Sequence, residues 1–116
     1  MEESILVSIK DMLGPDSSDD VFDSEILIHI NMALSVLTQL GVGPSEGFVV
    51  TDADATWNQF LGNAKDIEMA KSFVFMKVKM VFDPPTSSFT LSAMEKACDE
   101  LGWRLSVATD TTASSN

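Results

Sequence analysis

Residues 22–40 read FDSEILIHINMALSVLTQL, and this stretch decides the fold because its apolar residues fall on two sides of one helix. At about 100° per residue, the first face is formed by apolar side chains at helical spacing: Ile26, Ile30, Ala33, Leu37 and Leu40, widened by Leu27 and Leu34. A second stripe, Ile28, Met32 and Val36, lies on nearly the opposite side. Such a helix must bury both faces. It either sits centrally in the domain or buries one face inside and one against another subunit.

The segments next to this helix are also clear from local pattern. Residues 3–13 carry apolar side chains at helical spacing and end before a Gly-Pro pair, which stops helices. The polar linker 16–20 follows, and Asp20 or Asp23 is expected to cap the next helix. Residues 41–55 are rich in Gly, Pro and Asp around a short apolar run, which predicts a long loop with a brief extended segment.

The most apolar helix is predicted over residues 64–82. A short helical turn over 56–61, capped by Asp54, precedes it, and a Pro-Pro pair ends it. One face holds Ile67, Ala70, Val74, Val78 and Val81, and another holds Met69, Phe73, Met76 and Met80. Because so little of its circumference is polar, this helix is expected to be the central one.

A last helix is predicted over residues 88–106, with an apolar seam at alternating spacings of three and four: Leu91, Met94, Cys98, Leu101 and Leu105. The fold class is therefore all-α, a compact bundle of four to five helices with a long loop at about 41–55. Residues 1–106 are expected to form one helical domain. The small polar residues 107–116 are expected to be a flexible tail.

Composition narrows the classes of function. The chain has 116 residues, enough for one core, and a formal net charge of −11. Residues 1–64 hold eleven acids against one base, Lys10, whereas residues 65–116 hold seven acids against six bases. An acidic surface repels phosphate, so a tight grip on nucleic acid is disfavoured. The N-terminus lacks the basic start of a secretion signal and no apolar run is long enough for a membrane span, so we expect a cytoplasmic protein that binds no membrane.

The sequence offers no recognisable catalytic or metal-binding constellation. Cys98 and His29 are each the only residue of their type, too few for an all-protein zinc site. Cys98 falls on the apolar seam, and His29 lies between the two apolar faces of its helix, where a packing or interface role is expected. Asp52 and Asp54 lack the spacing of a calcium loop. We expect no enzymatic activity, no catalytic residue, no metal and no cofactor.

Binding to other proteins is the function that these residues favour. The helices carry more apolar surface than a bundle of this size can easily hide, which predicts self-association. The candidates for a subunit interface are Ile28, Met32, Val36 and Phe75. Trp103 is a large aromatic among charged residues, so it is a candidate docking residue together with Arg104 and Lys96. The alternative is that Trp103 covers the loop 41–55.

The order of these segments resembles the small head-tail connector proteins, also called adaptor or head-completion proteins, of long-tailed bacteriophages. The resemblance spans nearly the whole chain and rests on five pieces: Leu13-Gly14, the stretch from Asp19 to Pro44, the TWxxFL turn (Thr56 to Leu61), the stretch from Lys71 to Pro85 that ends in FDPP, and ELxWRL (Glu100 to Leu105). FDPP followed about fifteen residues later by ELxWRL is the distinctive combination.

The resemblance implies a structural virion protein at the head-tail junction, made in the host cytoplasm. Such a subunit forms a homo-oligomeric ring below the portal protein, continues the DNA channel, and helps head completion and tail attachment by docking a tail-side connector or stopper protein. DNA would only pass through. Residues Phe82, Asp83, Pro84 and Pro85 would be the turn that fixes the last helix, and Trp103 and Arg104 would belong to its packing or docking end.

Two further hypotheses accompany this resemblance. Asp16, Asp19 and Asp20 are candidates for acids that face the lumen of the ring, where they would keep DNA from sticking. An alternative function is an acidic helical regulator that mimics DNA and binds a nucleic-acid-processing partner. That alternative requires acids placed regularly on one surface, whereas several acids here cluster in linkers.

Overall fold

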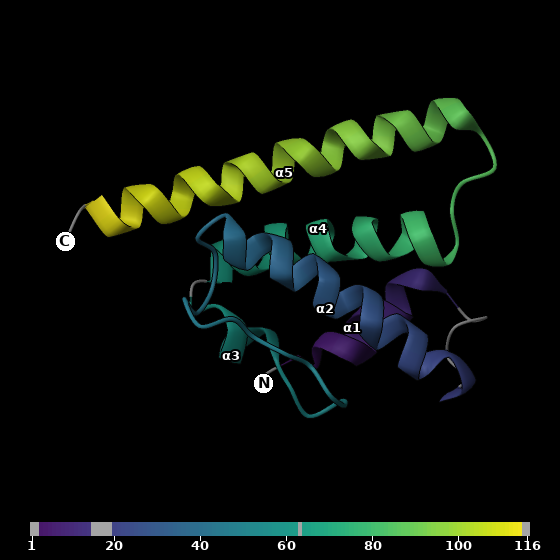
Figure 1. Ribbon diagram of the computed structural model, residues 1–116, viewed down its shortest axis with the longest axis horizontal. Helices are drawn as coiled ribbons and strands as arrows, with labels where there is room; N and C mark the ends of the chain where they lie inside the picture. The colour runs from purple at the N-terminus through teal and green to yellow at the C-terminus, as the bar shows by residue number, and fades with distance from the viewer. Residues whose placement is uncertain (1–2, 15–19, 63, 115–116) are drawn as a thin grey trace.

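The computed structural model describes residues 3–14, 20–62 and 64–114, and it arranges them as a bundle of five α-helices (Figure 1). The helices are α1 (Ile5–Leu13), α2 (Asp23–Gln39), α3 (Trp57–Phe60), α4 (Ala64–Phe82) and α5 (Ser88–Ser114), with a 3₁₀ turn, η2 (Asp20–Phe22), before α2. Figure 1 shows α5 running along the outside of the bundle beside α4. The predicted all-α fold is confirmed.

Helix α4 is the central helix, as its composition predicted. It contacts α1, α2, α3 and α5. Its buried residues are Ile67, Ala70, Phe73, Val74 and Val78. Burying one such side chain contributes about 1.5–3 kcal/mol, so this helix organises the core. Val81, which we expected on the core face, is 59% exposed.

Helix α2 packs with the face that the sequence indicated. Ile26, Ile30, Ala33, Leu34 and Leu37 are all buried. By length and composition alone, Asp20–Gln39 could cross a membrane. In the fold, one apolar side of this segment packs against α1 and α4. The other side carries the second stripe, Ile28, Met32 and Val36.

The predicted N-cap of α2 is wrong. The N-cap position is occupied by Phe22, which makes no side-chain capping hydrogen bond. The turn η2 leads directly into the helix, so Asp23 is already its first residue. The carboxylate of Asp23 instead lies 2.6 Å from Lys10 Nζ, and Asp20 lies 3.5 Å from the same ammonium. These contacts tie α1 to the start of α2, and they raise the pKa of Lys10, chiefly through the hydrogen bond with Asp23.

Helix α5 begins where expected and ends later. The Ser87 hydroxyl accepts a hydrogen bond from the backbone N–H of Thr90 at 3.3 Å, and this contact starts the helix at Ser88. The predicted seam is confirmed at Cys98 and Leu105, which are fully buried. The helix continues to Ser114, past the predicted end at 106, because no glycine or proline interrupts it there.

The close approach of α5 to the bundle depends on Gly102. A Cβ at this position would lie 3.0 Å from Cε2 of Phe73 and 3.4 Å from Cδ1 of Leu40. The glycine therefore lets the α5 backbone pack onto these two side chains, which belong to α4 and to the end of α2.

The side chain of Asn31 bonds the long loop after α2 to the bundle. Asn31 Nδ2 donates to the Val50 carbonyl at 2.9 Å, and its Oδ1 accepts from the Val50 N–H at 2.8 Å. Val50 itself is buried, and the ring of Phe48 lies 5.5 Å from that of Phe60. The predicted loop over 41–55 is thus confirmed, and its apolar run anchors it.

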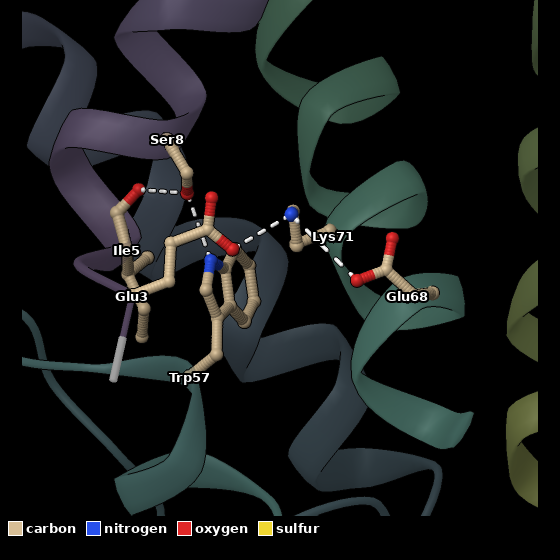
Figure 2. Close-up of polar contacts among 6 residues, drawn as sticks. All are labelled: Glu3, Ile5, Ser8, Trp57, Glu68 and Lys71. Atoms are coloured by element: carbon tan, nitrogen blue, oxygen red, sulfur yellow. Dashed lines mark hydrogen bonds and ion pairs between the residues drawn. The ribbon is translucent and has the colours of Figure 1, made fainter. Parts of the chain in front are cut away.

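The N-terminal segment is fixed by a clasp of polar contacts around Trp57 (Figure 2). The Ser8 hydroxyl donates to the Ile5 carbonyl at 3.0 Å and accepts from Trp57 Nε1 at 2.8 Å. Beside it, Lys71 Nζ lies 2.7 Å from Glu3 Oε1 and 3.7 Å from Glu68 Oε2. The hydrogen bond with Glu3 is the main reason that the pKa of Lys71 is raised.

The N-cap of α3 differs from the prediction. Thr56 caps the helix and forms a capping box with Gln59, whose side-chain Oε1 accepts a hydrogen bond from the Thr56 N–H at 3.1 Å. Asp54, the expected cap, lies two residues before the actual cap. Its backbone N–H instead donates to the Asp52 carboxylate at 2.9 Å, in a local turn.

Candidate partner-binding surfaces

The second stripe of α2 lies on the surface of the isolated subunit. Ile28 is 59% exposed, Met32 62% and Val36 36%. These three side chains contribute a contiguous apolar strip, with Ile28 and Met32 lining one shallow hollow and Met32 and Val36 lining another. Single exposed apolar residues are ordinary on proteins, but a row of them on one helix marks an interaction surface. The structure therefore leaves uncovered the face that the sequence said must be buried.

The second hollow, which we call the α2–α4 hollow, has a volume of about 170 Å³. It is lined by His29, Met32, Ala33 and Val36 from α2 and by Lys77 and Val81 from α4. Lys77 Nζ lies 5.6 Å from the centre of the Phe73 ring, within the range of a cation–π contact. The hollow is thus lined mostly by apolar side chains, together with His29 and Lys77.

Val81 is the residue of this surface that sequence reasoning missed. Its spacing from Val74 and Val78 matched the core face of α4, so periodicity alone assigned it to the interior. Its position beside the exposed stripe of α2 depends on how the two helices cross. A periodic pattern does not contain the crossing angle.

The outer face of α5 is a second exposed surface with large apolar side chains. Trp103 is 66% exposed, Phe89 83% and Val107 41%. At about 100° per residue these three positions fall on one side of the helix, opposite the buried Cys98 and Leu105. Trp103 therefore points away from the bundle, and the alternative that it covers the loop 41–55 is wrong.

The charged docking candidates flank Trp103 on the same helix. Lys96 is exposed and stands seven residues before Trp103, which places it on the same side of α5. Arg104 Nη2 lies 2.8 Å from Glu100 Oε2, and both side chains are more than half exposed. An exposed pair of this kind contributes a few tenths of a kcal/mol to the helix, so it leaves Arg104 open to exchange partners.

Phe75 and the turn after α4 lie apart from these surfaces. Phe75 is half-buried and packs against the core, so the structure does not bring it together with the α2 stripe. Phe82 is the last residue of α4, and its ring meets that of Phe22 edge-on, with ring centres 5.6 Å apart. Asp83 follows, 3.1 Å from Lys79 Nζ, and Pro84 and Pro85 form the link to α5.

Of the candidate lumen acids, the structure describes Asp20 alone. Its side chain is 94% exposed at the start of η2. Asp16 and Asp19 lie outside the described residues. The exposed position of Asp20 is compatible with contact to a neighbouring molecule or to solvent.

The remaining reactive groups are dispersed or buried. In the described parts of the chain, no three His, Cys, Asp or Glu side chains gather in a way that could hold a metal ion. The Cys98 thiol is buried, with Sγ 3.7 Å from the Phe73 carbonyl, and burial raises its pKa. A thiol with a raised pKa is a poor nucleophile, so Cys98 fits a packing role.

Comparison with known proteins agrees with a helical subunit that binds other proteins through its exposed faces. The family profile described as phage connector protein matches residues 5–112, nearly the whole chain. The chain therefore belongs to the phage connector protein family, which makes it a structural component of a phage virion that associates with portal and tail proteins. Neither the curated proteins nor the solved structures give a match.

Proposed function

We propose that this protein forms a homo-oligomeric ring between the portal and the tail, continues the DNA channel, and thereby aids head completion and tail attachment. The exposed strip Ile28, Met32 and Val36 is the observation that carries the proposal. A protein that works alone in water gains nothing from such a strip, whereas a ring subunit covers it with its neighbour.

The outer face of α5 gives the subunit a second exposed surface for binding partners. A subunit in a ring needs lateral contacts with its neighbours and axial contacts with the portal and the tail-side connector or stopper protein. The outer face of α5 carries Trp103 with charged residues around it, a composition typical of strong contact points in protein interfaces. Residues on this face are therefore candidates for docking.

The charge of the protein suits a channel through which DNA passes. The net charge of −11 disfavours the phosphate contacts that hold DNA-binding proteins in place. We propose that Asp16, Asp19 and Asp20 face the lumen. Changing all three to Asn should alter DNA retention in filled heads or the rate of ejection, and unchanged retention, ejection and phage yield would remove this assignment.

The ring is tested by measuring mass in solution over a range of concentrations, alone and with the portal ring of the same phage, followed by negative-stain imaging. We expect ring-shaped oligomers or a layer of subunits added to the portal. A chain that stays monomeric in both conditions, and binds neither portal nor tail proteins, would contradict the proposal.

A pair of matched variants connects assembly to the strip. Met32→Glu places a charge in the strip, and Asn58→Glu places the same charge on exposed α3. We expect Met32→Glu to lose assembly and Asn58→Glu to keep it. Equal assembly of the two variants would show that the α2 strip is not the contact.

A further inference from the structure

One exposed surface of this subunit contains a hollow, and the other carries a large exposed aromatic side chain. The α2–α4 hollow encloses about 170 Å³, well below the roughly 300–1,000 Å³ of pockets that hold small ligands. A hollow of this size suits one large side chain. Trp103 is a large side chain that stands free on the outer face of α5.

Trp103 cannot fill the hollow of its own chain. It lies on the side of α5 that is opposite Cys98 and Leu105, and those two residues face the bundle with 0% and 1% exposure. The hollow lies on the other side of that contact, between α2 and α4. The side chain and the hollow can meet only if they belong to different copies.

The chemistry of the hollow fits an indole ring. Met32, Val36 and Val81 offer an apolar surface, and thioether sulfur contacts aromatic rings favourably. The side chain of Lys77 completes the lining, and its ammonium lies 5.6 Å from the centre of the Phe73 ring. Charges of both signs surround Trp103, with Asp99 and Glu100 beside Lys96 and Arg104, so the fit to the hollow is that of its apolar ring.

We propose that Trp103 of one subunit inserts into the α2–α4 hollow of the next subunit. This contact joins two different surfaces, so after the first contact forms one copy still has an unused hollow and the other still has an unused Trp103. Such a heterologous contact propagates from copy to copy and closes into a ring when the rotation per subunit allows it. The inference rests on the proposed ring and specifies which residues make its lateral contact.

The test is complementation between two variants that each lack half of the contact. Trp103→Ala removes the side chain and keeps the hollow, whereas Met32→Glu blocks the hollow and keeps Trp103. Both residues are more than half exposed in the subunit, so neither change should disturb folding. Loss of a tryptophan at the centre of an interface weakens binding by roughly thirtyfold or more.

Sedimentation velocity then measures the size of each variant and of their equimolar mixture, at concentrations where the wild type assembles, alone or on the portal ring. We expect each variant alone to stay monomeric. The mixture should form 1:1 dimers and nothing larger. One copy supplies Trp103 and the other supplies the hollow, and the two sites left over, Ala at position 103 and the hollow blocked by Glu at position 32, cannot bind each other. Circular dichroism of both variants controls for folding.

Fluorescence gives a second measurement on the native surface. Trp57 is already buried, so quenching of wild-type emission by acrylamide reports mainly on Trp103. We expect quenching to fall as the protein assembles, and Trp103→Phe to lose most of this change.

The outcomes separate this inference from the function on which it rests. A mixture that stays monomeric, or a Trp103→Ala variant that assembles like the wild type, overturns the insertion of Trp103 and leaves the ring intact as a proposal. A wild-type chain that does not assemble with or without the portal contradicts the ring itself.

Discussion

Both sides of helix α2 carry apolar side chains, yet they differ in what covers them. On the inner side, Ile30, Leu34 and Leu37 are fully buried against the bundle. On the outer side, Ile28 and Met32 are more than half exposed. The two tryptophans repeat this contrast, because Trp57 is buried with its N–H bonded to Ser8 and Trp103 stands in solvent. The comparison teaches that inner residues should control folding and outer residues should control assembly.

The largest effect on folding is expected from the two tryptophans. Trp57→Ala removes a fully buried ring and leaves a cavity, so the free energy of unfolding should fall by about 3–5 kcal/mol. Trp103→Ala removes an exposed ring and should change it by less than about 0.5 kcal/mol. Urea denaturation at concentrations below assembly measures both. Similar losses for the two variants would break the distinction between inner and outer residues.

The two faces of α2 give the next comparison. Leu34→Ala creates a cavity in the core and should lower the free energy of unfolding by about 2–5 kcal/mol. Met32→Ala, two positions earlier on the same helix, should leave folding nearly unchanged and weaken assembly. Urea denaturation gives the first quantity and sedimentation the second. A Met32→Ala variant that unfolds as easily as Leu34→Ala would mean that the strip belongs to the core.

A smaller effect is expected at the buried hydrogen bond of the clasp. Ser8→Ala leaves Trp57 Nε1 without its acceptor inside the protein, which should cost about 1–3 kcal/mol of unfolding free energy. The double variant with Trp57→Phe removes both partners, so its loss should be less than the sum of the two single losses. If the loss of unfolding free energy in the double variant equalled the sum of the two single losses, the hydrogen bond would contribute nothing of its own.

The smallest effect is expected at the surface ion pair of Lys71 with Glu3. Because the folded state raises the pKa of Lys71 above its ordinary 10.5, the pair stabilises the fold fully below pH 10.5 and loses its contribution as the pH rises through the folded-state pKa. Glu3 is half exposed, so Lys71→Met should cost at most about 1 kcal/mol at neutral pH. The difference from wild type should shrink above pH 10.5, while Lys96→Met, at an exposed position, should show no such trend. If Lys71→Met lowered the free energy of unfolding by the same amount at every pH, the loss would come from packing and not from the ion pair.

Local chemistry explains which helix ends were predicted correctly. Gly14 and Gly41 have φ values of +111° and +86°, a conformation that favours glycine, so both stops could be read from sequence. The caps at Asp23 and Asp54 were wrong because several polar residues stood within one turn of each helix start. In the structure, Phe22 takes the N-cap position of α2 while Asp23 pairs with Lys10, and Thr56 forms the capping box of α3 with Gln59.

Long-range contacts account for the features that no local pattern revealed. The Ser8–Trp57 hydrogen bond joins residues 49 positions apart, and the Lys71–Glu3 pair joins residues 68 positions apart. The exposure of Val81 and the α2–α4 hollow depend on how the two helices lie against each other. Sequence periodicity places a side chain on a face of its own helix, but it does not say which neighbour lies over that face.

By itself, the sequence determined the all-α class, the central place of residues 64–82, the buried face of α2 and membership of a connector family, because helical periodicity and family-wide spacing are local or linear properties. Only the tertiary structure decided that Ile28, Met32 and Val36 remain uncovered in one subunit, that Val81 joins them, and that Trp103 faces away from the loop. The physical reason is that exposure is a property of how helices cross and where they end, and the free energy of packing the whole bundle sets both.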